Sequence, residues 1–284
     1  MTQEDGKPLI TLFSTFISKP KTDPAGLQKH LVQVNTMRAL AFLKPTVQAV
    51  IFSDDPVIKE IGDQEGVEVV PEQGGNQYHT PFLKNMFQWV EKNKDTPVNG
   101  YLNGDILFST DLIESIEAVL HAIADGRIHP RVLMIGQRTN FQEPFPLTED
   151  SEWVLKDPDT APEIIRQKYL RGVLFQEDAE DFFIITKGAF DWNKVPNFVV
   201  GRVAYDNALV DLAYHQGLDR VDLTKTVMAV HQTDQCGNKC GHESKPDYDY
   251  NKKLTRSWDH GLTSHANFET RRDSEGNVVI YARE

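Results

Sequence analysis

The residues best suited to chemistry stand in the stretch YLNGDILF, at positions 101–108. Asn103, Gly104 and Asp105 interrupt an apolar run there. These residue types are common in β-turns, which is the simplest interpretation. A hairpin tip would alternate in polarity, however, whereas this tripeptide lies in a run that we expect to be buried. A carboxylate in that place can bind a hard divalent cation that neutralises a diphosphate, and Gly104 would let the backbone bend and a ligand approach closely.

A second carboxylate lies in the segment GRVAYDNALVDLAYHQG, residues 201–217. Asp206 and Asn207 stand near the start of an amphipathic helical pattern, and Arg202 precedes Asp206 by four residues. The carboxylate could act only on the helix, because negative charge at a helix N-terminus is favourable. Alternatively, Asp206 faces a ligand cleft as the general base for an acceptor hydroxyl, Asn207 binds that acceptor, and Arg202 is the nearby cation. Both interpretations stay open.

His231 ends the apolar run MAVH, residues 228–231. It is either a structural residue or, with Asp105 near it, a metal ligand. Together with Cys236, Cys240 and His242, it could also form a zinc site. Because this is a single short cluster, we favour two ordinary reduced cysteines.

The elements that must position these residues alternate between strand and helix patterns up to residue 141. The strands are predicted at Leu9–Phe16, Val47–Asp55, 67–72, 100–108 and Arg131–Phe141, and the helices at Leu27–Leu43, 57–66, Thr80–Asn93 (capped by Thr80) and 111–126. This alternation predicts an α/β protein with a mostly parallel sheet and helices on both faces. Ligands bind such sheets at the carboxyl ends of the strands, where Ser14, Thr15 and Asp54 also lie.

After residue 141 the alternation stops. The sequence predicts a weak helix at 161–172, a strand from residue 180, a helix at Val203–Gly217 and a strand at 220–234 that runs into His231. The last fifty residues carry few helix or strand signals. We therefore expect one domain over 1–235, with a nucleotide-sugar half at 1–141 and an acceptor half at 142–235. Residues 236–284 would be a C-terminal lid or tail packed on the same domain.

Composition narrows the class of protein. The 284 residues are 39% hydrophobic and 25% charged, as in ordinary globular proteins. A formal net charge of −12 argues against broad nucleic-acid or anionic-membrane binding. There is no apolar run near the ~20 residues of a membrane span, the first residues are not a signal peptide, and the chain has two cysteines. These features predict a cytoplasmic protein.

The common nucleotide and hydrolase motifs are missing. The segment GGNQYH, residues 74–79, is followed by no P-loop lysine, and no G-x-G-x-x-G or G-x-S-x-G occurs. A P-loop enzyme, a dinucleotide-binding Rossmann enzyme and an α/β-hydrolase are therefore disfavoured.

From TLFSTF to AVHQTD, the order of the motifs resembles the GT-A glycosyltransferases, the nucleotide-diphospho-sugar transferases. TLFSTF, with Ser14, Thr15 and Phe16, is similar to their first strand and nucleotide-contacting loop, and VIFSDD, with Asp54, to the second strand, whose aspartate reaches the base or ribose. NGDILF stands where the family has its Asp-x-Asp metal motif, GRVAYDN where it has the acceptor-activating carboxylate, and AVHQTD where a late histidine completes the metal site. Asn103 replaces the first aspartate of the metal motif, so it can hydrogen-bond a sugar or ribose but supplies no charge.

The resemblance implies a glycosyltransferase that moves a sugar from a nucleotide-diphosphate donor, with UDP the commonest, to a hydroxyl acceptor such as a glycan. Mn²⁺ or Mg²⁺ on Asp105 and His231 would stabilise the leaving diphosphate, with help from Arg202. Asp206 would remove the acceptor proton. A single displacement then inverts the anomeric configuration, although retention stays open.

Two alternatives remain. One is a sugar-1-phosphate nucleotidyltransferase, which the single glycine in the loop STFISKPKTDPAG, residues 14–26, disfavours. The other is a non-catalytic nucleotide-sugar-binding module.

Overall fold

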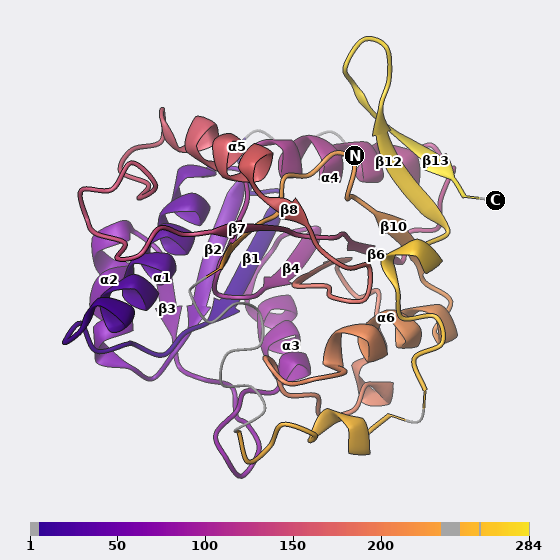
Figure 1. Ribbon diagram of the computed structural model, residues 1–284. Helices are drawn as coiled ribbons and strands as arrows, with labels where there is room; N and C mark the ends of the chain where they lie inside the picture. The colour runs from indigo at the N-terminus through magenta and orange to yellow at the C-terminus, as the bar shows by residue number, and fades with distance from the viewer. Residues whose placement is uncertain (1–5, 234–244, 256, 284) are drawn as a thin grey trace.

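The apolar runs form the central strands of a nine-stranded sheet (Figure 1). The computed structural model describes residues 6–233, 245–255 and 257–283. In spatial order the strands are β13 (Val278–Ala282), β12 (Phe268–Arg272), β10 (Asp219–Asp222), β6 (Val132–Ile135), β9 (Phe182–Thr186), β4 (Val98–Leu102), β1 (Ile10–Thr15), β2 (Val47–Phe52) and β3 (Glu68–Val70). Within this sheet only β9 and β13 run antiparallel to their neighbours. The predicted α/β class with a mostly parallel sheet is confirmed.

A second sheet of four strands pairs β5 (Ile106–Leu107), β11 (Val230–Thr233), β7 (Thr139–Gln142) and β8 (Val173–Leu174). It corrects three of the predicted strands. The predicted strands at 100–108, Arg131–Phe141 and 220–234 were each wrong as single strands, because each begins in the large sheet and ends in the small one. Each of these three segments turns at the carboxyl edge of the large sheet, and the chain from β8 to β9 makes a fourth connection between the small sheet and that edge.

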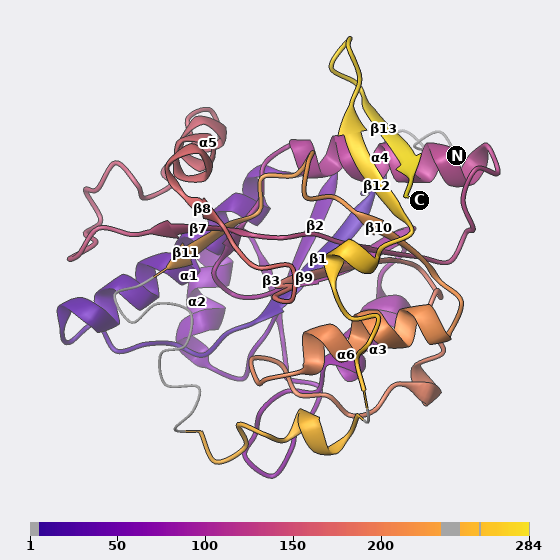
Figure 2. The ribbon, with the colours of Figure 1, turned by 45° about the vertical axis from the view of Figure 1, so that its right-hand side comes forward.

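Helices cover both faces of the large sheet. On one face lie α1 (Pro24–Phe42), α2 (Pro56–Glu65) and α4 (Asp111–Ala124), and on the other α3 (Leu83–Asn93) and α6 (Tyr205–His215). Figure 2 shows α4 on the side opposite α3 and α6. The remaining helix, α5 (Ala161–Arg171), packs on the small sheet through Ile165. No helix in the part of the chain that the structure describes is long and apolar enough to cross a membrane.

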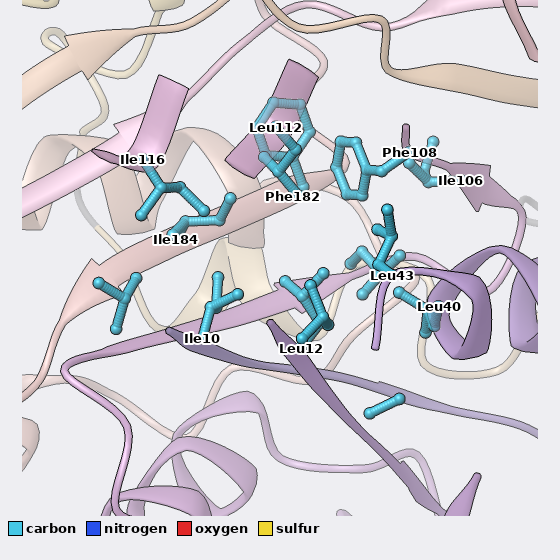
Figure 3. Close-up of a cluster of buried hydrophobic side chains, with 14 of the residues drawn as sticks. Ile10, Leu12, Leu40, Leu43, Ile106, Phe108, Leu112, Ile116, Phe182 and Ile184 are labelled. Carbon is cyan, nitrogen blue, oxygen red and sulfur yellow. The ribbon is translucent and has the colours of Figure 1, made fainter. Parts of the chain in front are cut away.

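The hydrophobic core beneath α4 packs this helix against central strands of the large sheet. In Figure 3, Ile10 of β1 and Ile184 of β9 lie in the same cluster as Leu112 and Ile116 of α4. Full burial of such a side chain stabilises the fold by roughly 1.5–3 kcal/mol relative to leaving it exposed. The strand ends that follow this core are therefore held on a rigid support.

The start of α3 differs from the prediction. The helix begins at Leu83, not at Thr80, and its N-cap residue Phe82 makes no side-chain capping bond. The reason lies in contacts distant in sequence. Thr80 Oγ1 donates a hydrogen bond to Asp247 Oδ2 at 2.5 Å, and Phe82 pairs with Val199 in an isolated bridge. Both contacts keep this segment extended.

The C-terminal segment adds β12 and β13 to the large sheet, and the sequence analysis detected neither strand. Glu269 of β12, which is 3% exposed, joins them to the neighbouring segments. It accepts hydrogen bonds from Lys225 Nζ at 2.9 Å and from Arg283 Nε at 3.2 Å. Ion pairs therefore stabilise this edge of the sheet where the sequence pattern is polar. The predicted division of the chain near residue 235 stays a prediction.

Candidate active site

Asn103 follows the last residue of β4 and connects three elements. Its Nδ2 donates a hydrogen bond to Asp181 Oδ1 at 2.5 Å, which ties it to the start of β9. Its Oδ1 accepts hydrogen bonds from the hydroxyl groups of Tyr101 and Tyr205, each at 3.0 Å. Tyr205 is the first residue of α6, so the amide of Asn103 fixes the distance between β4 and the helix that carries Asp206.

Gly104 packs against Phe16, which is 3% exposed. A β-carbon at position 104 would lie 2.5 Å from the edge of the Phe16 ring, closer than any side chain tolerates. Close packing against Phe16 therefore requires glycine at position 104, whereas the sequence analysis expected Gly104 to make room for a ligand. The same contact places Phe16, at the end of β1, directly beside the turn.

Asp105 and His231 meet as the sequence analysis expected. Asp105 Oδ2 lies 3.2 Å from His231 Nε2. The small sheet brings them together, because His231 pairs with Ile106 and the backbone N–H of Gln232 donates to Asp105 O at 3.0 Å. The second carboxylate oxygen, Asp105 Oδ1, is buried and has no hydrogen-bond partner.

The charges around Asp105 keep it ionised. Burial by itself raises the pKa of this carboxyl, but the charge and hydrogen bond of His231 and the charge of Arg138 outweigh it, so the pKa lies below its ordinary value. An ionised carboxylate with a buried, partnerless oxygen is therefore present near Arg138 at neutral pH.

Arg138 is the cation of this site that the sequence analysis missed. It is 6% exposed, forms a short ion pair with Asp181, and donates from Nε to Asn140 Oδ1 at 3.0 Å. Its guanidinium also lies over the ring of Phe175, 4.4 Å from the ring centre. The contacts with Asp181, Asn140 and Phe175 together fix the orientation of the Arg138 guanidinium.

Burial lowers the pKa of Arg138, and the neighbouring Asp105, Asp206 and Glu180 act in the opposite direction. The guanidinium therefore stands among the carboxylates of three different segments. Its signal in the sequence was its place just after the apolar run RVLMIG, residues 131–136, inside the predicted strand. Asp181 was hidden because β9 runs antiparallel, so its first residues, not its last, lie at the carboxyl edge of the parallel strands.

Asp206 lies in the first turn of α6, and its Oδ1 is buried without a hydrogen-bond partner. Burial raises the pKa of its carboxyl to about 7. The N-cap residue of this helix is Ala204, and no side chain caps it. A carboxyl whose pKa lies near the working pH is suited to general-base catalysis.

Glu180 is a second buried carboxyl at this point. It is fully buried, and its Oε1 has no hydrogen-bond partner. Burial, and then the charge of Asp206, raises the pKa of Glu180 well above its ordinary value. Two carboxyls that repel each other titrate at separate pH values, so Glu180 is kept neutral while Asp206 can ionise.

Arg202 and Asn207 make protein contacts. Arg202 Nε donates to Asp247 Oδ1 at 2.6 Å, and its NH1 donates to Gly201 O at 2.8 Å. Asn207 Nδ2 donates to the carbonyl oxygens of Asp178 and Gly261, both at 3.0 Å. None of these hydrogen bonds connects Arg202 or Asn207 to Asp105 or His231.

The residues predicted to bind the nucleotide lie at the ends of β1 and β2. Ser14 is fully buried and its Oγ has no partner. Thr15 Oγ1 donates to Glu72 Oε1 at 2.9 Å, and exposed Asp54 accepts from the Glu72 backbone N–H at 3.2 Å. Thr15, Asp54 and Glu72 thus form one polar group, next along the sheet edge from Phe16.

A metal would have few protein ligands here. Across residues 6–233, 245–255 and 257–283, no group of three or more His, Cys, Asp or Glu residues could hold an ion. The zinc candidates Cys236, Cys240 and His242 lie outside the described residues. Mg²⁺ commonly binds through one or two protein ligands together with substrate phosphates. Asp105, with its partnerless Oδ1, and His231 fit that mode.

No protein-family model and no curated protein matches the sequence. Among solved structures, the chain is similar to one from Desulfovibrio desulfuricans G20 that is provisionally described as a nucleotide-diphospho-sugar transferase. The TM-score is 0.45 at 9% identity, over 87% of this chain and 95% of that one. It is also similar to TarS from S. aureus, with a TM-score of 0.45 and 11% identity over 79% of this chain and 36% of TarS.

Proposed function

We propose that this protein is a glycosyltransferase that transfers a sugar from a nucleotide-diphosphate donor, with a UDP-sugar the first choice, to a hydroxyl of an acceptor such as a glycan. The observation that carries the proposal is the carboxyl of Asp206. It has a buried oxygen without a partner and a pKa of about 7, and its neighbour Arg138 also acts on Asp105. This group stands at the carboxyl edge of a mostly parallel sheet, where ligands of such folds bind.

Asp206 acts as the general base. At neutral pH a large fraction of this carboxyl is ionised, and its Oδ1 can accept the proton of the acceptor hydroxyl as that oxygen attacks the sugar. Burial favours the neutral acid that results. One base in a single displacement inverts the anomeric configuration.

Arg138 stabilises the leaving nucleoside diphosphate. Arg202, the cation proposed from the sequence, stays a proposed donor contact, and its guanidinium donates to Asp247 at 2.6 Å. Arg138 interacts electrostatically with both Asp105 and Asp206, so its positive charge lies near the proposed base and near the proposed metal ligand. A fixed cation in a site of low dielectric constant stabilises developing negative charge strongly.

Asp105 and His231 would hold a Mn²⁺ or Mg²⁺ ion, with His231 binding through a neutral ring nitrogen. When bound, the ion adds positive charge at the leaving diphosphate. Ser14, Thr15, Phe16 and Asp54 remain the proposed nucleotide contacts, Asn103 and Gly104 the proposed sugar contacts, and Asn207 a proposed acceptor contact.

The test is nucleoside-diphosphate release from a panel of nucleotide sugars, with and without Mn²⁺ and an acceptor mixture. We expect slow release from one donor without acceptor, faster release with it, and loss of both in Asp206→Asn. Asp211→Asn is the matched control, because this buried aspartate lies on the same helix and binds His260 N at 2.9 Å. Binding of a donor without any release would instead show a binding module, and formation of a nucleotide sugar from a sugar 1-phosphate would show a nucleotidyltransferase.

A further inference from the structure

The turn that leads into α6 has an unfavourable backbone conformation. Ala204, the N-cap residue of the helix, has φ 72° and ψ 3°, which is the left-handed region. Among the described residues, only His79, with φ 58°, is a second non-glycine residue with positive φ. A β-carbon disfavours this conformation, so surrounding contacts must hold it, and such outliers gather at functional sites.

Asn251 holds the chain on the N-terminal side of Ala204. Its side chain is fully buried. Its Oδ1 accepts from Val199 N at 2.9 Å, while its Nδ2 donates to Val199 O at 3.0 Å and to Val203 O at 3.3 Å. A single amide therefore fixes both ends of the segment 199–203.

Asp247 holds the same segment from a second direction. It is 3% exposed and accepts from Arg202 Nε at 2.6 Å, from Thr80 Oγ1 at 2.5 Å and from Asn76 Nδ2 at 2.8 Å. Bonds to an ionised carboxylate are about twice as strong as neutral ones. Asp247 thus joins the turn before α6 to residues 76–80, the segment that contains the other strained residue, His79.

We propose that residues 245–255, through Asn251 and Asp247, are the positioning element for the general base. They hold Ala204 in its left-handed conformation, which directs the first turn of α6 so that Asp206 Oδ1 stays buried and the carboxyl lies beside Glu180 and Arg138. Asn251 and Asp247 are positioning residues, because they act through the backbone of 199–204. The inference rests on the proposed role of Asp206.

This role differs from general support of the fold in one measurable respect. If the hydrogen bonds of Asn251 and Asp247 to this segment are lost, Ala204 relaxes to an ordinary conformation, the first turn of α6 rotates, and Asp206 Oδ1 becomes exposed to water. Contact with water lowers the pKa of a carboxyl toward its ordinary value. A residue that only stabilises the fold would leave the pKa of Asp206 where it is.

The experiment compares Asn251→Ala with Asn267→Ala. Asn267 is the matched control, because its Oδ1 accepts from Arg220 N at 2.7 Å and its Nδ2 donates to Asp219 Oδ1 at 2.8 Å, on the β10 edge of the sheet. We expect Asn251→Ala to lower kcat at least tenfold with KM for the donor changed less than threefold, and to move the lower pH midpoint of transfer downward. Asn267→Ala lowers Tm alone.

Two further variants separate the outcomes. Ala204→Gly added to Asn251→Ala restores most of kcat, because glycine adopts the left-handed conformation without strain. Asp247→Asn, which keeps shape but removes charge, serves if Asn251→Ala does not fold, and we expect it to lower kcat and move the pH midpoint in the same direction. Loss of kcat with an unchanged pH midpoint and no rescue by Ala204→Gly would overturn the proposal.

A readout without activity keeps this test independent of the proposed function. The free energy of unfolding is measured against pH for each protein and for its Asp206→Asn counterpart, and the difference reports the titration of Asp206. If the wild-type protein turns over no donor, the proposed function fails. The positioning role fails separately if Asp206 titrates at the same pH with and without Asn251.

Discussion

Asp206→Asn should change stability in a way that depends on pH. The ordinary pKa of this carboxyl is 3.8, and burial raises it to about 7 in the folded protein. Between these two values the folded protein binds a proton that the unfolded chain has lost. The free energy of unfolding of the wild-type protein therefore falls, relative to that of Asp206→Asn, as pH rises from about 4 to about 7. The shift of about 3 pH units corresponds to at most about 4 kcal/mol.

The assay is urea unfolding of both proteins from pH 4.5 to 8, with single-turnover transfer measured over the same range. The wild-type rate should rise with pH through about 7 as the base loses its proton, and the variant should be slower by roughly a hundredfold or more at pH 8, the scale of general-base loss. Asp211→Asn is the control for both. A stability difference that is flat with pH, or a variant with the wild-type rate, would refute the reasoning.

Three other predictions follow from single contacts. Asp105→Asn should abolish the extra rise in Tm that Mn²⁺ gives in the presence of donor, and an unchanged rise would remove Asp105 from the proposed metal site. Gly104→Ala should destabilise the fold by about 1–3 kcal/mol, since its new β-carbon meets the Phe16 ring, and Phe16→Leu should recover part of that loss in urea unfolding. Burial raises the pKa of Glu269, but its hydrogen bonds with Lys225, Arg271 and Arg283 outweigh burial and lower the pKa from 4.5 to about 2. The stabilisation that ionised Glu269 provides is therefore complete above pH 4.5 and disappears as pH falls toward 2. Glu269→Gln should flatten that part of an acid-unfolding curve.

Local sequence patterns predicted the strand–helix order and the residues at the strand ends. Asp105 and His231 were expected to meet, and they lie 3.2 Å apart. Both stand next to apolar runs, so their places beside buried strands follow from the pattern of their own segments.

The features that sequence reasoning missed depend on pairing between distant segments. Asp181 reaches the site because β9 is antiparallel, and Arg138 because the chain passes from β6 to β7 there. No residue near Thr80 shows that its hydroxyl will bind Asp247, a contact that replaces the predicted helix cap. Strand β13 is half-exposed at a sheet edge, where a buried apolar run is not required.

The small sheet has a consequence for how the protein acquires its site. The pairs Ile106–His231 and Asn140–Val173 join residues far apart in the chain, so loop-closure entropy opposes them until the intervening chain is ordered. The Asp105–His231 pair depends on the first of these pairings. A nascent chain that ends before residue 230 can form the strands from β1 to β4, but it lacks one half of this pair. The Asp105–His231 pair therefore forms late, after β11 has been synthesised and has paired with β5 and β7.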